Sequence, residues 1–442
     1  MQYHPARAVK KNVVIVGGGL AGLAASIYLA RGGRNVTLFE KRRYLGGRAI
    51  TTHRHGYRFN LGAHALYRQG LAAAVYRELG IPVRGNAPST AGTALFRGDA
   101  YRLPGGIFSL LTTSLLSLRG KRQLASAFLR IRRNEAARAG DVTLGEWLDD
   151  RFTDNRARQV MEAFFRLFTY SSDVRAQRAS LALAQARLGV RGGVLYLDEG
   201  WQKLVDSLHS AAISSGVHFV SSARIVGVVH DDRVRAVELG GLDLDADRMD
   251  TQAIAFPAND PDLVEGALIP ADTVLLAVDP ASAASLAGNE GEAWTRAQPV
   301  KAACLDVGLR SLPRPRATFA LGIDDPVYLS VHSAAAHLAP KGGALIQSIK
   351  YGGTDAVADE RALERLLDRF QPGWRELIVH RRFLPSMVVA NALVTPSAPR
   401  PSVATSVRGL YLAGDWVGDE GLLSDAALAS ARAASKAILA ET

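Results

Sequence analysis

Glycines and one acid near the start of the chain have a spacing that can bind a dinucleotide. Gly17, Gly19 and Gly22 fit G-x-G-x-x-G. In this pattern the first glycine allows a tight turn, the second lets a pyrophosphate approach the backbone, and the third lets a helix pack on a strand. Glu40 follows about 20 residues later, where a carboxylate can accept both hydroxyls of an adenosine ribose. The residues expected to bind this part of a cofactor are Gly17, Gly19, Leu20, Ala21, Gly22, Glu40 and Lys41.

The sequence around these residues predicts the strands and the helix that must position them. Val13–Val16 is a β-branched run that predicts a buried parallel strand, and the Ala- and Leu-rich segment Leu20–Ala30 predicts a helix. Val36–Phe39 predicts a second strand, which ends at Glu40. Glycines placed between a strand and a helix, with an acid after the next strand, indicate a dinucleotide much more specifically than the glycines alone. NAD and FAD both remain open at this point.

A second glycine pair favours the longer cofactor. Gly46, Gly47 and Arg48 follow the acid, which suits a dinucleotide whose pyrophosphate and ribityl chain continue past this loop. With this GG-R motif the sequence resembles the flavin-containing amine oxidase and phytoene desaturase superfamily. The resemblance implies an α/β fold, with a Rossmann-like FAD-binding domain of the glutathione-reductase type and an inserted α+β substrate domain.

The C-terminal part strengthens the resemblance. In LYLAGDW a buried strand is predicted to end at Gly414 and Asp415, and an Ala-rich helix follows over Asp425–Leu439. The resemblance implies that the backbone of this Gly-Asp pair holds the pyrophosphate and that Asp415 holds the ribityl chain. The helix N-terminus, near Leu423 and Ser424, would point its N–H groups at flavin N1 and O2. The positive end of a helix dipole stabilises the negative charge of a reduced flavin.

Further cofactor contacts are implied by the same resemblance. The segment YRFNLGAH is similar to the one that passes the flavin ring, with Gly62 against the ring face and Ala63 and His64 beside it. Backbone near Ile225 would contact adenine, and Ala277, in a buried apolar run, is expected in the same site. His64 is a candidate acid–base group, although a histidine in such a place is more often a packing residue.

The catalytic features of amine oxidases are only partly present. In that family a lysine on a substrate-domain strand is bridged by water to flavin N5, and Lys301 has a comparable place in KAACLDVGL. A surface lysine at a strand edge is the alternative. Two aromatic residues should also flank the amine, but the corresponding positions are the aliphatic Leu422–Leu423 and Met387–Val389. This difference favours a hydrocarbon-like or polycyclic substrate.

We therefore expect an FAD-dependent oxidoreductase that desaturates a hydrophobic small molecule by hydride transfer to N5, with oxygen or a quinone as electron acceptor. The alternatives are an amine oxidase that oxidises a C–N bond with oxygen and, more remotely, a non-catalytic lipid- or partner-binding protein of the same fold, such as the GDP-dissociation inhibitors. No G-x-S-x-G elbow or convincing His-x-x-x-His pair occurs, so neither a serine hydrolase nor a metal site is expected.

The length of 442 residues predicts more than one core. The FAD-binding domain is expected to comprise residues 1–84, 191–290 and 400–442. The substrate-binding domain, a helical cap plus a sheet, is expected to comprise residues 85–190 and 291–399.

Charge and composition limit the partners. The net charge of +11 favours polyanions or an anionic membrane surface. Basic and apolar residues alternate in RGKRQLASAFLRIRRN, which predicts either a helical cap with a solvated basic face or a membrane-facing surface on which Phe128, Leu129 and Ile131 dip inward. The single cysteine, Cys304, and the lack of an apolar leader in MQYHPARAVKK suit the cytoplasm, with peripheral contact to the inner face of the membrane as an option. No nucleic-acid partner is expected.

Overall fold

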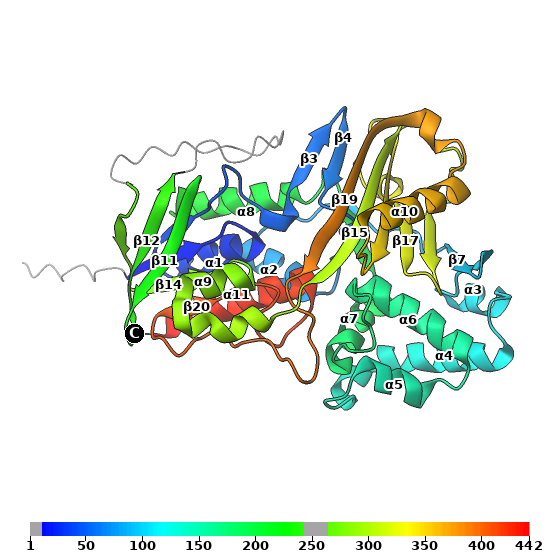
Figure 1. Ribbon diagram of the computed structural model, residues 1–442, viewed down its shortest axis with the longest axis horizontal. Coiled ribbons are helices and arrows are strands. Elements are labelled where there is room, and N and C mark those ends of the chain that lie inside the picture. Colours follow the sequence, from blue (N-terminus) through cyan, green and yellow to red (C-terminus); the bar gives the residue numbers. More distant parts are fainter. Residues whose placement is uncertain (1–10, 243–263, 442) are drawn as a thin grey trace, which may run out of the picture.

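The computed structural model describes residues 11–242 and 264–441, which form two halves side by side, each built around one sheet (Figure 1). One half contains a five-stranded parallel sheet, and the other a seven-stranded mixed sheet. The long strands β15 and β19 lie where the two halves meet (Figure 1). The predicted α/β class with a parallel sheet is confirmed.

The five-stranded sheet is buried on both faces, which explains the uninterrupted apolar run of its first strand. Val13 and Ile15 pack with one layer of helices, whereas Val14 and Val16 pack with a second sheet and a helix on the opposite face. The strand order is β10 (His218–Val220), β2 (Asn35–Phe39), β1 (Asn12–Val16), β14 (Thr273–Leu276) and β20 (Leu410–Leu412). The helices of the first layer are α1 (Leu20–Arg31), α2 (Leu71–Leu79), α8 (Gln202–Ser214) and α11 (Leu423–Ala440). The opposite layer consists of β11 (Ala223–His230), β12 (Val234–Leu242), β13 (Leu268–Pro270) and α9 (Pro280–Ala287).

The seven-stranded sheet also lies between two layers. Alternate residues of β15 face opposite sides, so that Cys304 packs toward a helical layer and Leu305 toward α10 (Ala356–Phe370). The strand order is β19 (Ile378–Ala390), β15 (Val300–Leu309), β18 (Ala344–Tyr351), β17 (Val327–Val331), β16 (Phe319–Gly322), β7 (Thr93–Phe96) and β8 (Asp99–Arg102). The helical layer contains α3 (Ile107–Thr112), α4 (Leu118–Arg132), α5 (Leu144–Arg151), α6 (Asn155–Thr169) and α7 (Ala179–Gly192).

Smaller elements connect the halves. A hairpin of β3 (Thr51–Arg54) and β4 (Tyr57–Asn60) lies next to β15 and β19 (Figure 1), and β9 (Val194–Leu197) pairs with both β5 (Leu66–Tyr67) and β6 (Gly85–Asn86). Short 3₁₀ helices occupy Gly47–Ala49, Glu135–Arg138, Gly288–Arg296, His332–Ala334 and Trp374–Leu377. The predicted domain boundaries stay a prediction.

Two expectations need correction. The strand expected to reach Gly414 ends at Leu412, so the Gly-Asp pair lies in the loop that follows. On α4, Ile131 is 1% exposed and Phe128 packs edge-on against Phe164, so the prediction that both dip toward a membrane is wrong. The helical period places Ile131 on the buried face of α4, and Leu129 stays exposed.

Candidate functional site

The first glycine turn is shaped by close packing at two positions and by open space at a third. Gly17 has φ +108°, and a Cβ there would lie 2.6 Å from the carbonyl oxygen of Ala277. A Cβ on Gly22 would lie 2.0 Å from the carbonyl oxygen of Gly17, because α1 packs directly on the turn. A Cβ on Gly19 would meet no atom within 4 Å. The backbone at Gly19 therefore faces free space.

The second glycine pair borders the same space. The backbone N–H of Gly46 donates to the carbonyl oxygen of Gly18 at 2.8 Å, and Gly19 and Gly46 form a parallel bridge. Helix α1 begins at Leu20, and its N-cap residue Gly19 supplies no side-chain cap, so the first N–H groups of the helix point at this space uncapped. Bare backbone and a helix N-terminus form a surface suited to a phosphate group.

Glu40 is held by backbone donors beside this turn. Its Oε2 accepts from the N–H of Gly18 at 2.8 Å and its Oε1 from the N–H of Arg42 at 3.0 Å. The N–H of Ala223 donates to the carbonyl oxygen of Glu40 at 3.0 Å, which places the first part of β11, including Ile225, next to the acid. Lys41 is exposed beside it. The acid and the segment expected near adenine are thus brought together.

The two ends of the chain meet through an ion pair. Arg48 Nη2 lies 2.8 Å from Asp415 Oδ1, and the Asp415 side chain is only 2% exposed. Asn391 donates to the same carboxylate through its backbone N–H at 3.0 Å and its side-chain amide at 2.9 Å. The Gly-Asp turn is closed by Ser430, whose Oγ accepts from the N–H of Gly414 at 2.9 Å. These contacts fix Asp415 at the junction of both halves.

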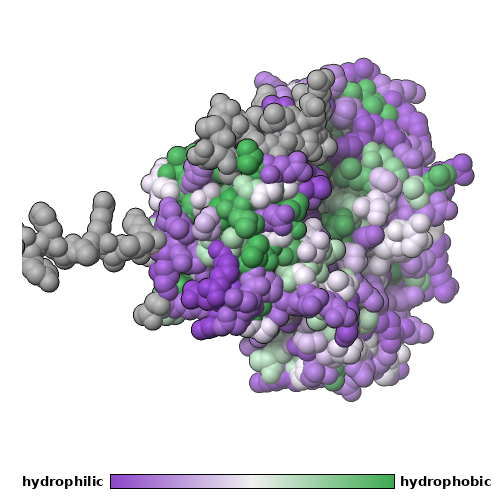
Figure 2. Space-filling view, turned by 60° about the vertical axis from the view of Figure 1, so that its left-hand side comes forward, coloured by the Kyte–Doolittle hydropathy of each residue, from purple (hydrophilic) through white to green (hydrophobic). Residues whose placement is uncertain are grey.

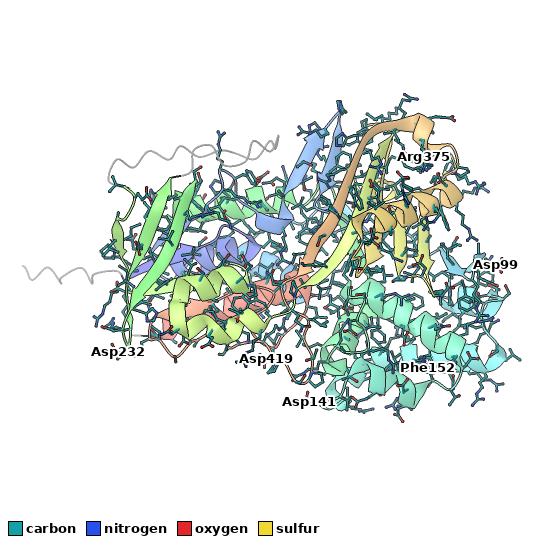
Figure 3. All side chains as sticks on the ribbon, in the orientation of Figure 1. Asp99, Asp141, Phe152, Asp232, Arg375 and Asp419 are labelled. Carbon is teal, nitrogen blue, oxygen red and sulfur yellow. The ribbon has the colours of Figure 1, made fainter. Side chains whose placement is uncertain are left out.

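Sequence reasoning missed two residues of this junction. Arg400 donates through Nη1 to the carbonyl oxygen of Asp415 at 3.0 Å and through Nη2 to that of Gly421 at 2.9 Å. Burial lowers the pKa of Arg400 to about 10, so it remains charged at neutral pH. Asn391, at the end of β19, is the other missed residue. An arginine between prolines and an asparagine after a strand carry no local signal of these contacts. Figure 3 labels Asp419, in the loop between Asp415 and α11, at the lower edge of the half that contains the five-stranded sheet.

Helix α11 begins with free N–H groups and a buried acid. It starts at Leu423, two residues earlier than predicted, and its N-cap residue Leu422 provides no side-chain cap; Ser424 lies in the first turn. Asp425 accepts from the N–H of Ala72 at 2.8 Å through Oδ1, while its Oδ2 is buried without a partner. Burial raises the pKa of Asp425 to about 6. Asp425 was not predicted from the sequence.

The segment Gly62–His64 lies against β15 and β19. A Cβ on Gly62 would lie 2.3 Å from Met387 Sδ and 3.5 Å from Cys304 Sγ. Ala63 is buried in the adjoining apolar cluster. His64 Nδ1 is hydrogen-bonded to the carbonyl oxygen of Gly62 at 3.0 Å. Burial lowers the pKa of His64, so this imidazole is neutral at pH 7 and can accept a proton.

A buried charge pair supports this segment. Asp306 is fully buried on β15 and accepts from Arg382 Nε at 3.1 Å. Arg382 also donates to the carbonyl oxygen of Asn60 and, at 3.2 Å, to Thr52 Oγ1. The pair therefore ties the β3–β4 hairpin to the sheet immediately before Gly62.

Lys301 does not lie with His64. It is exposed and pairs across the sheet with Val388, whereas the next pair is Ala302 with Met387. Because residues alternate along a strand, Lys301 faces the α10 side of β15, and Cys304, which contacts the Gly62 position, faces the other side. This placement favours the interpretation of Lys301 as a surface residue.

An apolar recess adjoins the junction. It is lined by Val300, Ala390, Asp415, Leu422 and Leu423, together with the start of α7. Leu423, Met387 and Val389 each pack against the apolar cluster that includes Ala63. Figure 2 shows hydrophobic side chains gathered in a hollow where the two halves meet. The surroundings of the recess are thus mainly aliphatic.

Comparison with known proteins assigns this arrangement to a family. Residues 20–303, well over half of the chain, match the family model described as flavin-containing amine oxidoreductase. The chain belongs to this family. The backbone cradle, the uncapped helix ends and the Arg48–Asp415 pair fit a flavin cofactor, FAD, as the family description implies.

Individual relatives cover shorter parts. The chain is 34% identical over 167 residues to a Mycobacterium tuberculosis protein that carries the name of a flavin-containing monoamine oxidase, a match that covers 35% of this chain and 36% of that protein. It is 36% identical over 76 residues to the phytoene desaturase of Cercospora nicotianae, covering 17% of this chain and 12% of the relative. The matches thus span about a third or less of these relatives. A Methanosarcina mazei oxidoreductase shares the fold, with a TM-score of 0.75, 17% identity and coverage of 96% of this chain and 100% of that one.

Proposed function

We propose that this oxidoreductase desaturates a hydrophobic small molecule, with a hydride passing from a substrate carbon to flavin N5. The observation that carries the proposal is that the positions of the expected aromatic pair are aliphatic. Leu422 and Leu423 line the recess, Leu423, Met387 and Val389 pack against one apolar cluster, and Met387 lies against Gly62. Amine oxidases are expected to have an aromatic pair at these positions. A hydride leaving a C–H bond requires an apolar pocket that excludes water, which aliphatic side chains provide.

The FAD cradle is part of the same proposal. Bound FAD supplies the ring that accepts the hydride. The pyrophosphate would be held by the bare backbone at Gly19 and Gly47 and by the first turn of α1, and the ribose by Glu40. The remaining residues proposed to contact the cofactor are Gly17, Leu20, Ala21, Gly22, Lys41, Gly46, Arg48, Gly62, Ala63, His64, Ile225, Ala277, Gly414, Asp415, Leu423 and Ser424.

His64 is the proposed acid–base residue. Removal of a hydride from a saturated C–C unit leaves a proton to be lost from the neighbouring carbon, and a neutral imidazole can take it. His64 lies beside Gly62 and is neutral at pH 7 because burial lowers its pKa. In the His64→Gln variant, the substrate should reduce the flavin more slowly than in the wild type, and the reduction rate should no longer depend on pH.

Anaerobic bleaching of the flavin tests the proposal. The holoenzyme is mixed without oxygen with amines, carotenoid precursors and porphyrinogens, and the flavin absorbance is followed. Bleaching by an apolar polyene precursor, but not by small amines, is expected. Bleaching by small amines alone would contradict the proposal.

An amine oxidase that uses oxygen is the second candidate, and the identity to the monoamine oxidase relative favours it. In that mechanism Lys301 would assist flavin reoxidation. Lys301→Met should leave the rate of reoxidation by oxygen within about twofold of the wild-type rate, because Lys301 faces the α10 side of its strand. A large decrease would support the amine oxidase candidate. A colourless preparation that takes up no FAD would instead favour a binding protein.

We propose that oxygen or a quinone is the electron acceptor. We also propose that the reaction takes place in the cytoplasm or at the inner face of its membrane. Within the described residues, no helix combines the length and apolarity needed to cross a bilayer. Apolar side chains form one cluster that extends from Leu110 of α3 to Leu423 at the junction. A hydrophobic substrate would find compatible surroundings along this cluster.

A further inference from the structure

A short helix at one end of the molecule exposes its apolar side chains. Helix α3, far from the β11–β12 hairpin in Figure 1, contains no buried residue. Ile107, Phe108 and Leu111 are 84%, 71% and 66% exposed, and Leu118 and Leu129 of the adjacent α4 are 75% and 56% exposed. We call these five residues the apolar tip. Large apolar side chains exposed together on neighbouring elements commonly mark an interaction site.

The apolar tip is held in a fixed position. Lys121 Nζ donates to the carbonyl oxygen of Leu111 at 2.7 Å, which satisfies the last turn of α3 from α4. Thr113 Oγ1 donates to the carbonyl oxygen of Arg102 at 2.7 Å, and Arg102 Nη1 donates to Thr112 Oγ1 at 2.9 Å. These bonds fasten α3 to both α4 and β8. Figure 3 marks this end of the molecule with Asp99, the first residue of β8. The side chains therefore point outward from a fastened helix.

Basic residues lie on the elements next to α3 that carry or support the apolar tip. The cations on β8 and α4 and at the end of α4 are Arg102, Arg119, Lys121, Arg122, Arg130, Arg132 and Arg133. Acids also lie nearby. Glu135 is buried and paired with Arg151 at 3.1 Å and with Arg130 at 3.9 Å, and Asp154 accepts from Ser117 Oγ, at the N-cap of α4, at 2.7 Å. Asp99 is exposed on β8, so the cations outnumber the acids on these elements. Leu118 and Leu129 are three helical turns apart and so lie on one stripe of α4. Apolar and cationic side chains are therefore presented together.

The charges decide between two occupants. A second copy of the chain docking through the same surface would bring cations against cations, which is unfavourable. An anionic lipid bilayer offers hydrocarbon for the apolar side chains and phosphates for the basic ones. We propose that the apolar tip inserts into the surface of an anionic membrane, with the basic residues at headgroup level. This surface lies apart from the flavin site and the proposal does not depend on the reaction.

Co-sedimentation of the holoenzyme with vesicles tests this surface. Vesicles of phosphatidylcholine, with or without phosphatidylglycerol, are compared at low and high salt. Wild type should bind the anionic vesicles and lose affinity with salt. Ile107→Ser/Phe108→Ser should lower the affinity by about tenfold or more, since two large side chains no longer leave water. Val357→Ser is the matched control, because Val357 is 58% exposed on α10, and it should bind as wild type.

Three results would overturn the proposal. The first is no binding of wild type to anionic vesicles at low salt. The second is wild-type affinity of Ile107→Ser/Phe108→Ser. The third is a concentration-dependent dimer that this variant abolishes, which would assign the surface to a second copy. Flavin absorbance and anaerobic bleaching with detergent-dispersed substrate, measured on each variant, show whether the fold and the reaction are intact, so a failure here is separate from a failure of the proposed reaction.

Discussion

An alanine at position 19 should separate cofactor binding from folding. Gly19 has φ −76° and ψ −176°, an extended conformation open to any residue, and a Cβ there would meet no atom within 4 Å. The flavin-free chain should change its free energy of unfolding by less than about 1 kcal/mol. Alanine restricts the unfolded chain more than glycine does, which slightly stabilises the folded chain. Alanine is also a poorer N-cap residue than glycine, and this offsets the gain.

FAD binding should respond much more strongly. If the pyrophosphate occupies the space before Gly19, the new methyl group overfills it, which typically costs about 1–3 kcal/mol. At about 1.4 kcal/mol per tenfold change in Kd, FAD should bind roughly 5- to 150-fold more weakly. Gly22→Ala is the contrast, because its Cβ would lie 2.0 Å from the carbonyl oxygen of Gly17 and should destabilise the folded chain itself.

The assay is a titration of the flavin-free chain with FAD, followed by flavin fluorescence, with urea unfolding of the same preparations. Weaker FAD binding at unchanged unfolding free energy is expected for Gly19→Ala. Wild-type FAD affinity in Gly19→Ala would show instead that the pyrophosphate does not lie in the space before Gly19. Loss of stability in this variant would show that the space is not free.

Three further changes have defined outcomes. The pKa of Asp425 is about 6 in the folded chain and about 3.9 in an unfolded chain. This difference stabilises the folded chain by about 3 kcal/mol below about pH 4, and the contribution is lost as the pH rises through 6. Asp425→Asn should therefore flatten the pH dependence of the unfolding free energy, measured with urea from pH 4 to 8. Arg382→Met should lower the unfolding free energy, measured with urea, by about 3–5 kcal/mol, because it leaves the buried Asp306 carboxylate without its cation. Adding Asp306→Asn should restore part of this free energy. Equal unfolding free energies of the single and double variants would contradict the pairing. Lys301→Met should leave flavin reoxidation unchanged within about twofold, as measured by stopped-flow mixing with oxygen; a tenfold loss would place Lys301 in the mechanism.

Much of the cradle was predictable because its signals are local. The first glycine turn must follow a strand and precede a helix, and the sequence shows both within a short span. Arg48 and Asp415 were expected at the same cofactor from opposite ends of the chain, and they lie 2.8 Å apart. The proximity of Arg48 and Asp415 was predictable only through the resemblance to the family, because no local sequence pattern links two residues so far apart in the chain.

The contacts that hold the junction were not predictable, because they depend on tertiary packing. Arg400 stands between two prolines, where nothing in the local sequence signals a contact, yet its guanidinium donates to the carbonyl oxygen of Asp415. Lys301 lies on the strand expected for a lysine near flavin N5, but its side chain is on the opposite face of the sheet. This can be seen only from the structure, in which alternate residues of β15 pack toward α10. For α4, the helical phase of Leu124, Ala127 and Ile131 already indicated an inward face, so Ile131 could have been assigned to the core from the sequence.

Anaerobic reduction of the bound flavin distinguishes desaturation of an apolar substrate from oxidation of an amine. The full chain is purified with its flavin and mixed, without oxygen, with an apolar polyene precursor and, separately, with small primary and secondary amines. We predict that the polyene bleaches the flavin and that a product with one more double bond accumulates in proportion. Bleaching by the amines with none by the polyene would contradict the account.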